Sequence, residues 1–363
     1  MRIFLLITIV LLSAASLFAQ YESVFPGLEG QNLLDELRDN YRPTINLSYG
    51  EARDTLYGNI ESPNDSLTCV YTGYTIYLDP ALDPTTAAFM NDGPDAINTE
   101  HTYPQGLGAS GPLRADMHNF YPSRKDVNGE RGSDPFGEIN DNQTETWWIL
   151  DQNQTTIPTS NIDAYSEDRN GLFEPRDVHK GNVARSMFYF YTIYKAEADA
   201  EDPNYFNSQV QTLCDWHVLD PVDAREYDRT KQIAVYQDGL ENPFVLDCTL
   251  AERSYCSGLI ECDPISSTSE SVLSIGRIAR IAPNPSAGQT QVQYLLRSAA
   301  TVQFSLVDML GKQTLLGVDR QSQAGIYTYE IGLNGVKKGM YLLQIVIETN
   351  SGVQIDIQKV IFQ

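Results

Sequence analysis

The sequence predicts an α+β region followed by a small all-β domain, and three patterns support this fold class. Residues 180–197 place apolar side chains mostly three and four positions apart, which is the spacing of a helix with one buried face. Residues 67–77 are rich in β-branched and aromatic side chains, which favours a strand. After residue 274, short alternating segments follow one another between glycine-containing turns, which indicates an immunoglobulin-like β-sandwich.

The first half of the α+β region is predicted to begin with a helix over residues 32–38, which the run Tyr41-Arg42-Pro43 ends. After the strand at 67–77, a second strand ends at His101, and a loop follows through residues 106–112. Short polar and apolar runs of this kind are typical of a mixed domain.

A third strand is predicted near residues 117–121, followed by a helix that carries Asn128. Pro122 and Ser123 suit the start of this helix, with the Ser123 hydroxyl as its cap. The strand that ends at His101 and the helix that carries Asn128 are therefore expected to pack together.

The second half of the region is predicted to hold one more strand and several helices. Residues 144–150, TETWWIL, form the strand, whose two tryptophans are expected in the core rather than stacked on bases. Residues 163–171 are acidic, but their spacing does not match a calcium loop, so a polar surface loop is expected. Two further helices are predicted over residues 206–215 and 223–236.

The chain of 363 residues is long enough for two domains and a signal. Residues 1–19 read as a secretory signal peptide, with Arg2 before an apolar run and cleavage after Ala19. No other apolar run approaches the length of a membrane span. We expect an exported monomer with no membrane span.

Five cysteines follow the signal peptide, and none has the CxxC spacing of a metal site. Disulfides are the ordinary expectation in an exported protein. Two bridges and one free thiol are predicted, with the pairing left open. These cysteines are Cys69, Cys214, Cys248, Cys256 and Cys262.

Residues 263–274, DPISSTSESVLS, are rich in serine and threonine and predict a linker between domains spanning 20–262 and 275–363. The second domain is expected to contain alternating strands. Their predicted ranges are 291–296, 302–308, 327–331, 340–349 and 354–362.

The formal net charge of −23 disfavours nucleic-acid binding when the whole surface is considered, because the binding surface is normally basic. Binding is local, however. Residues 113–131 hold four Lys or Arg against three Asp or Glu, and residues 176–195 hold four against one. A nucleic-acid site requires these basic side chains to converge on one groove.

The stretch 98–138 carries the chemistry. Glu100 supplies a hard oxygen ligand and Asn128 can supply a carbonyl oxygen, which suits Mg²⁺ or Ca²⁺ rather than zinc. No second histidine lies four residues from His101, so the zinc-protease pattern is absent. An unliganded His101 beside such an ion is placed to take a proton from water. The combination indicates phosphodiester hydrolysis, against the plain alternative of two polar surface residues.

Several motifs in the same order resemble the endonuclease I family of secreted nucleases, which have the His-Me finger (ββα-metal) fold. The matching runs are EHTYPQ, DMHNFYPSRKDVNGERG, PFGE, KGNVARSMFYFYTIY, DWHVLDPVDAREYDR and NPFVLD. The resemblance implies that His101 is the general base and that Glu100 and Asn128 hold one Mg²⁺, with Ca²⁺ or Mn²⁺ as alternatives. It also implies products that carry a 5′-phosphate.

Some relatives place a phosphate-stabilising arginine on an insertion that this chain lacks. Arg114 and Arg131 are the two candidates for that role here. Four further side chains are predicted either as phosphate contacts or as parts of solvated helix faces. They are Arg124, Lys125, Lys180 and Arg185. Of the remaining histidines, His118 is expected to be structural, and His179 and His217 are expected to be structural or exposed rather than catalytic.

The last 85 or so residues resemble the C-terminal sorting domain of type IX secretion cargo. The matching runs are APNPSAG, VDMLGK, LNGVKKGMYLLQI and QKVIFQ. The resemblance implies export by the type IX secretion machinery, followed by release or attachment to the cell surface. A generic immunoglobulin-like binding module is the alternative.

The sequence therefore predicts a secreted, metal-dependent endonuclease that cleaves DNA and RNA with little sequence preference. One alternative is a phosphodiesterase that acts on small substrates. The other is a surface nucleic-acid-binding protein whose catalytic site has decayed.

Overall fold

The computed structural model describes residues 22–89, 93–257 and, apart from short gaps, 275–363. The gaps in the last range are 287, 297, 309–310, 322, 324, 333–336 and 350–351. The predicted signal peptide (1–19) and linker (263–274) lie outside the described residues. Within the described part of the chain, no helix is long and apolar enough to cross a membrane.

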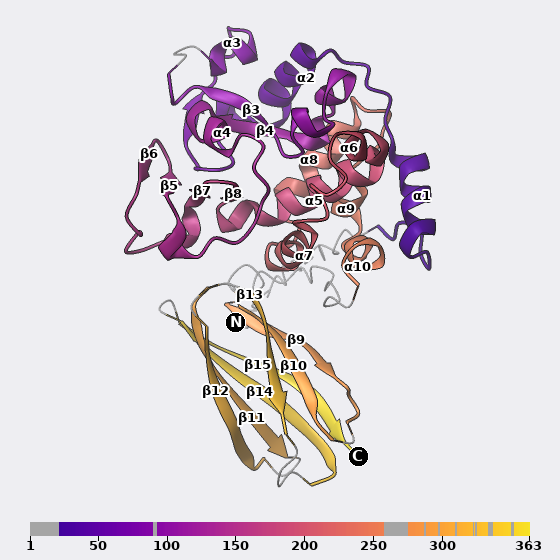
Figure 1. Cartoon of the computed structure of the whole chain (residues 1–363), viewed down its shortest axis with the longest axis vertical. Helices are drawn as coiled ribbons and strands as arrows, with labels where there is room; N and C mark the ends of the chain where they lie inside the picture. Colours follow the sequence, from indigo (N-terminus) through magenta and orange to yellow (C-terminus); the bar gives the residue numbers. More distant parts are fainter. Residues whose placement is uncertain are drawn as a thin grey trace, which may run out of the picture.

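Helices are the predominant regular elements of the region before residue 257 (Figure 1). They are α1 (Gly30–Tyr41), α2 (Tyr49–Thr55), α3 (Pro84–Ala88), α4 (Lys125–Arg131), α5 (Asp177–Ile193), α6 (Lys195–Glu201), α7 (Val210–Leu219), α8 (Ala224–Ala234), α9 (Pro243–Leu246) and α10 (Thr249–Ser254). Short 3₁₀ turns lie at Pro63–Asp65, Gln105–Leu107, Gly111–Ala115, Met117–Asn119, Asp141–Gln143 and Ile162–Ala164, and a π-helical segment, Leu56–Ile60, continues α2.

Helix α5 is the centre of the core, where it packs against α1, α7 and α9. The expectation that it buries one face was wrong, because almost every residue from His179 to Ile193 is buried. Its polar side chains therefore have to find partners inside the protein. The helix also ends earlier than expected. At Tyr194 the backbone leaves helical geometry (φ −122°, ψ 33°), and α6 begins at the next residue.

Strands β3 (Ile97–His101) and β4 (Phe120–Arg124) form an antiparallel pair that leads directly into α4. The prediction placed the second strand near 117–121, but residues 117–119 form a 3₁₀ turn. Pro122 fits inside the strand because its carbonyl faces away from β3 and accepts a hydrogen bond from the Val70 N–H at 3.0 Å. Its missing N–H would face the same way, so no bond between β3 and β4 is lost. Ser123 is consequently a strand residue, not the predicted helix cap.

The predicted strand over 67–77 is a hairpin of β1 (Ser66–Thr68) and β2 (Thr75–Tyr77). The chain turns at Gly73, whose φ of 72° favours glycine.

A four-stranded antiparallel sheet holds the two tryptophans of the predicted strand 144–150. Its order is β6 (Gln152–Gln154), β5 (Thr146–Ile149), β7 (Ser166–Arg169), β8 (Leu172–Glu174). Trp147 and Trp148 are buried, as expected. The polar surface loop expected over residues 163–171 was wrong in part, because Glu167 and Asp168 are buried in β7.

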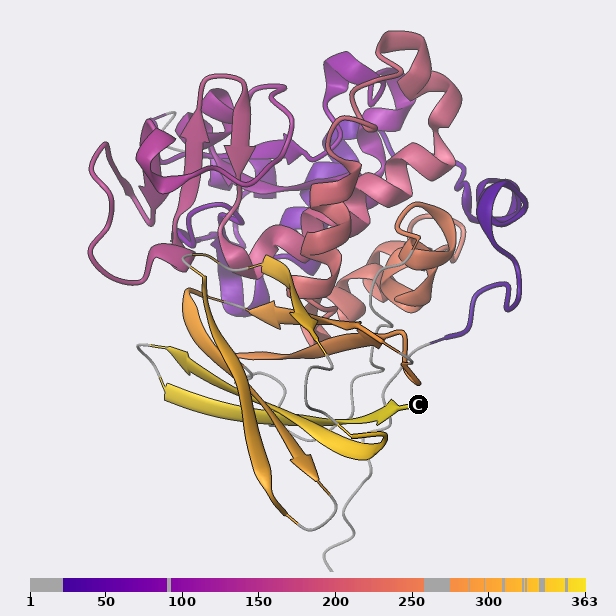
Figure 2. The same cartoon turned by 60° about the horizontal axis from the view of Figure 1, so that its bottom comes forward.

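Residues 275–363 form two facing antiparallel sheets (Figure 2). One has the order β13 (Gly325–Ile331), β10 (Thr290–Leu296), β9 (Gly276–Ala282), and the other β12 (Gln313–Gln321), β11 (Ala300–Asp308), β14 (Gly339–Thr349), β15 (Gly352–Phe362). Side chains from both sheets share one hydrophobic core. The predicted all-β domain with two packed sheets is confirmed, although β9 and β12 were not anticipated, and its immunoglobulin-like topology stays a prediction.

One disulfide joins Cys214 in α7 to Cys256 just after α10. Cys248 is also disulfide-bonded. Cys69 is a buried free thiol. The expected combination of disulfides with a free thiol is consistent with these three observations, although Cys262 lies outside the described residues.

Candidate active site

The candidate site is built on β3, β4 and α4. Glu100 and His101 are the last two residues of β3, paired with Tyr121 and Phe120 of β4. Helix α4 follows β4 without a loop, so Asn128 returns to the end of β3 from which the histidine projects. These three neighbouring elements therefore fix the positions of Glu100, His101 and Asn128, the residues that the sequence predicted to form the site.

His101 is held by hydrogen bonds on both ring nitrogens. Its Nε2 lies 2.9 Å from the carbonyl oxygen of Arg114, which can only accept, so Nε2 carries the proton. Its Nδ1 then keeps the lone pair and accepts from the Gln105 amide at 3.2 Å. Burial and, to a smaller extent, nearby arginines lower the pKa of His101 to about 4, although the hydrogen bond to the Arg114 carbonyl acts in the opposite direction. The ring is therefore a neutral base near pH 7, with Nδ1 as the basic atom.

Glu100 is almost completely buried, at 1% exposure, and is fixed through one oxygen. Its Oε1 accepts from the Tyr71 hydroxyl at 2.7 Å and lies 3.1 Å from Nη1 of Arg131. No described residue donates to Oε2. Burial raises the pKa of this carboxyl, while Arg131 and Tyr71 act in the opposite direction. A further positive charge near Oε2 would offset the free-energy cost of burying the ionised carboxylate.

Asn128 presents an oxygen in the same place. Its Nδ2 donates to the carbonyl of Thr99 at 3.0 Å, which fixes the amide beside the residue that precedes Glu100. Because the nitrogen side is used in this way, Oδ1 is the side-chain atom left to accept. Within the described residues, no donor occupies it.

The side-chain oxygens of Glu100 and Asn128 are the type of ligand that a hard divalent cation binds, and each residue keeps one oxygen without a hydrogen bond. The described part of the chain contains no group of three or more His, Cys, Asp or Glu side chains that could hold a metal ion. A cation at this place would therefore have two protein ligands and would take the rest of its oxygens from water and substrate. Such a site favours Mg²⁺ over zinc.

Arg131 does not fit the predicted contact with the transition state. Its guanidinium is buried at 1% exposure and donates to the carbonyls of His101 and Thr102 at 3.1 and 2.9 Å. It also lies beside Glu100 and donates to the Tyr205 hydroxyl. A side chain committed to these groups holds β3 in place and does not face substrate.

Arg114 is the better placed of the two arginine candidates. It is exposed, its carbonyl holds His101, and its guanidinium carbon lies 4.6 Å from the ring centroid of Tyr49. The Tyr49 ring is 5.6 Å from the His101 ring, centroid to centroid. An exposed cation thus lies next to the base.

Arg124 is buried rather than facing a nucleic-acid groove. Its guanidinium donates to the Leu150 carbonyl and forms ion pairs with Asp126 and Asp95. The predicted phosphate contact does not fit this position. Lys125, its neighbour at the start of α4, is exposed.

Lys180 and Arg185 are also buried, because α5 has no solvated face. Lys180 forms ion pairs with Glu174 at 2.6 Å and with Glu138 and Asp177. Arg185 makes two bonds to Glu226, at 2.7 and 2.6 Å. These charges are satisfied within the protein, so the expectation that they meet phosphate does not fit the structure.

The other histidines occupy structural positions, as expected. His118 and His217 donate from Nε2 to the carbonyls of Leu240 and Cys248, both at 3.0 Å. His179 is buried between the rings of Tyr71 and Tyr121. Burial lowers the pKa of all three, which keeps them neutral.

The sequence interpretation missed the side chains that support the site. Tyr71 lies 29 residues before Glu100, and Tyr49 and Arg53 lie on α2, well before the motif. Gln105, by contrast, lies inside the EHTYPQ run and only its role was missed. A hydrogen-bonding tyrosine or an arginine on a distant helix has no sequence signal of its own.

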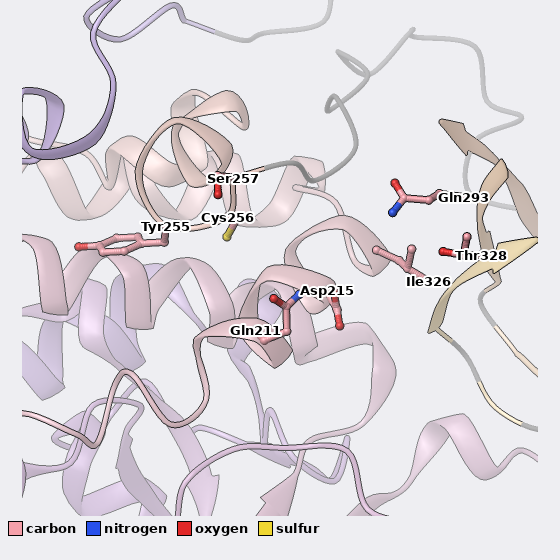
Figure 3. Close-up of a pocket in the computed structure, with 8 residues that line it drawn as sticks. All are labelled: Gln211, Asp215, Tyr255, Cys256, Ser257, Gln293, Ile326 and Thr328. Carbon is pink, nitrogen blue, oxygen red and sulfur yellow. Dashed lines mark hydrogen bonds between the residues drawn. The ribbon is translucent and has the colours of Figure 1, made fainter. Parts of the chain in front are cut away.

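The pocket drawn in Figure 3 lies elsewhere, where α7 and the end of α10 face β10 and β13. It has a volume of about 360 Å³ and is lined by Gln211, Asp215, Tyr255, Cys256, Ser257, Gln293, Ile326 and Thr328. None of the candidate catalytic residues lines it.

A neutral histidine whose own strand and neighbouring helix also present a carboxylate and an amide oxygen is an arrangement that a hydrolase can use. The chain belongs to the endonuclease I family, since residues 32–248 match the family model described as endonuclease I. Residues 280–363 match a secretion system C-terminal sorting domain.

Two relatives are named extracellular ribonucleases. The chain is 25% identical over 255 residues to that of Bacillus subtilis (strain 168), covering 65% of this chain and 79% of the relative. It is 27% identical over 162 residues to that of Bacillus amyloliquefaciens, covering 41% and 50%. Among solved structures, the chain matches the sensor domain of the anti-sigma factor RsgI4 from Pseudobacteroides cellulosolvens with 8% identity and a TM-score of 0.20. The match covers 25% of this chain and 99% of that chain, and it is too weak to support an argument. The protein is therefore a nuclease, secreted or held at the cell surface.

Proposed function

We propose that the protein is a metal-dependent endonuclease that hydrolyses DNA and RNA with little sequence preference, and that β3, β4 and α4 form a His-Me finger. The observation that carries the proposal is the fixed tautomer of His101, whose Nδ1 lone pair lies on the same unit as the free oxygens of Glu100 and Asn128. The names of the two relatives support RNA as one substrate.

In this mechanism, Nδ1 of His101 takes a proton from the attacking water after Gln105 yields its place. The Arg114 carbonyl keeps the ring oriented and stabilises the proton on Nε2. The water oxygen bonds to phosphorus while the bond to the 3′ oxygen breaks. The leaving 3′ oxygen takes a proton from solvent water, so the products are a 5′-phosphate and a 3′-hydroxyl.

Glu100 and Asn128 would hold a single Mg²⁺, with Ca²⁺ or Mn²⁺ as alternatives. The ion would supply positive charge to the scissile phosphate and the leaving oxygen. Tyr71 and Arg131 keep Glu100 oriented through Oε1, which would leave Oε2 available to such an ion. Arg114 would contact the phosphate from the exposed side.

The test uses the full-length protein and supercoiled plasmid, with Mg²⁺ or with a chelator. Wild type should nick the plasmid only with the metal, and His101→Ala should lower the rate by about 10²–10⁴-fold. Arg38→Ala, on the exposed face of α1, is the control and should cleave like wild type.

Plasmid that stays intact with Mg²⁺, Mn²⁺ and Ca²⁺ would overturn the proposal, and continued DNA binding would then favour a surface nucleic-acid-binding protein. Undiminished cleavage by His101→Ala would show that another group is the base.

A further inference from the structure

Two arginines near the candidate base lack the partners that the other arginines have. In residues 22–89 and 93–257, every arginine except Arg53 and Arg114 donates a side-chain hydrogen bond or forms an ion pair. For Arg53, Nε is moreover buried with no hydrogen-bond partner. In a chain with a net charge of −23, two such cations side by side require an explanation.

Both guanidinium groups lie against the ring of Tyr49. The Cζ of Arg53 is 4.8 Å from the ring centroid and that of Arg114 is 4.6 Å from it. The two carbons are therefore less than about 10 Å apart. The same ring is 5.6 Å from the ring of His101.

Different parts of the chain bring these cations together. Tyr49 and Arg53 are four residues apart on α2, so they share one face of that helix. Arg114 lies in the 3₁₀ turn Gly111–Ala115, and its own carbonyl is the one bound by His101. Contacts between α2 and this turn fix the two arginines relative to the base.

An arginine without a carboxylate partner suits a phosphate, which its planar guanidinium can bind through two parallel hydrogen bonds. Two arginines on one ring can bind two phosphates of one strand. We propose that Arg53 binds the phosphate next to the scissile one, while Arg114 meets the scissile phosphate. The site is thereby suited to polynucleotides rather than to single phosphodiesters, an inference that rests on the proposed function.

The experiment compares a single-stranded 12-mer with a dinucleotide that contains one phosphodiester, using the full-length protein with Mg²⁺. For Arg53→Ala we expect kcat/KM on the 12-mer to fall by about 10–100-fold, mainly through KM, because a charge-assisted hydrogen bond is lost. The loss on the dinucleotide should be at least several-fold smaller. Arg38→Ala, which removes a surface arginine elsewhere, should match wild type on both substrates.

Salt dependence supplies a second readout. One lost phosphate contact should lower the slope of log(KM) against log[salt] for the 12-mer by about one unit. Arg53→Lys keeps the charge and should keep the slope. If circular dichroism shows that Arg53→Ala is unfolded, Arg53→Lys replaces it in the test. A slope of log(KM) against log[salt] for Arg53→Lys that differs from the wild-type slope would count against the proposal.

The assignment of Arg53 would be overturned if Arg53→Ala lost equal kcat/KM on both substrates, or if it cleaved the 12-mer like Arg38→Ala. In either case, cleavage by wild type would still support a nuclease. Failure of wild type on every substrate would instead remove the proposed function itself.

Discussion

At the scale of single residues, the buried pair of Arg131 and Glu100 holds the candidate site together. Arg131→Met would leave Glu100 buried without its cation, which we expect to cost about 3–5 kcal/mol in the free energy of unfolding. Burial already raises the pKa of Glu100, and losing Arg131 removes the main influence that lowers it. Cleavage should therefore fall as well. Urea unfolding and plasmid nicking measure the two effects.

Arg38→Met is the matched control, because Arg38 pairs with Asp35 on an exposed surface. Such pairs contribute about 0–1 kcal/mol. If Arg131→Met were no less stable than Arg38→Met, the structural role assigned to Arg131 would be refuted.

The sequence predicted the proximity of the candidate catalytic residues better than the surroundings of the candidate phosphate contacts. Glu100, His101 and Asn128 lie within thirty residues and form one unit, as predicted. Arg185 pairs with Glu226, 41 residues away, and local sequence does not show that a basic side chain will be neutralised by so distant a carboxylate. The contact between Tyr49 and Arg114 joins residues even farther apart in the chain, and local sequence does not show it either.

At the scale of elements, β7 places Asp168 in an acidic environment. Burial, and then the charges of Glu130, Asp134 and Glu145, raise its pKa to about 7. The unfolded value is about 3.9. Between these two values the folded protein retains a proton that the unfolded chain has released, so this group makes stability fall as pH rises from about 4 to about 7.

Asp168→Asn should remove that dependence. We expect the variant to match wild type near pH 4 and to be more stable at pH 8 by up to about 4 kcal/mol, which is the free energy that corresponds to the difference between pKa values of about 4 and about 7. Each kcal/mol raises the melting temperature of a domain of this size by about 2–4 °C. Differential scanning calorimetry across this pH range measures the change, with Asp151→Asn in the exposed β5–β6 turn as control. A stability gain that is the same at both ends of the pH range would refute the pKa assignment.

Element types were easier to predict than their boundaries and surroundings. The periodicity of residues 180–197 correctly indicated a helix, but it did not show that α1, α7 and α9 would enclose α5. The strand β4 was placed three residues too early, because a proline in a strand depends on which side of the sheet its missing N–H faces. Both differences arise from tertiary contacts.

At the scale of the whole molecule, the chain has two hydrophobic cores. One lies within residues 22–257 and the other within the β-sandwich. Leu295 and Ile326 of the sandwich pack against the first core, and Gln323 donates to Asp141 at 3.2 Å. The sandwich also faces α7 and the end of α10 through β10 and β13.

A protein that ends at residue 262 should therefore fold and cleave plasmid at the rate of the full chain, because each domain buries its own core. We expect its melting temperature to fall only by the small amount that loss of the Leu295 and Ile326 contacts implies. Plasmid nicking and calorimetry on both forms provide the comparison, with His101→Ala in the shortened protein as the inactive control. A shortened protein that folds but does not cleave would show that the sandwich contributes to the site, which would contradict the independence of the two cores.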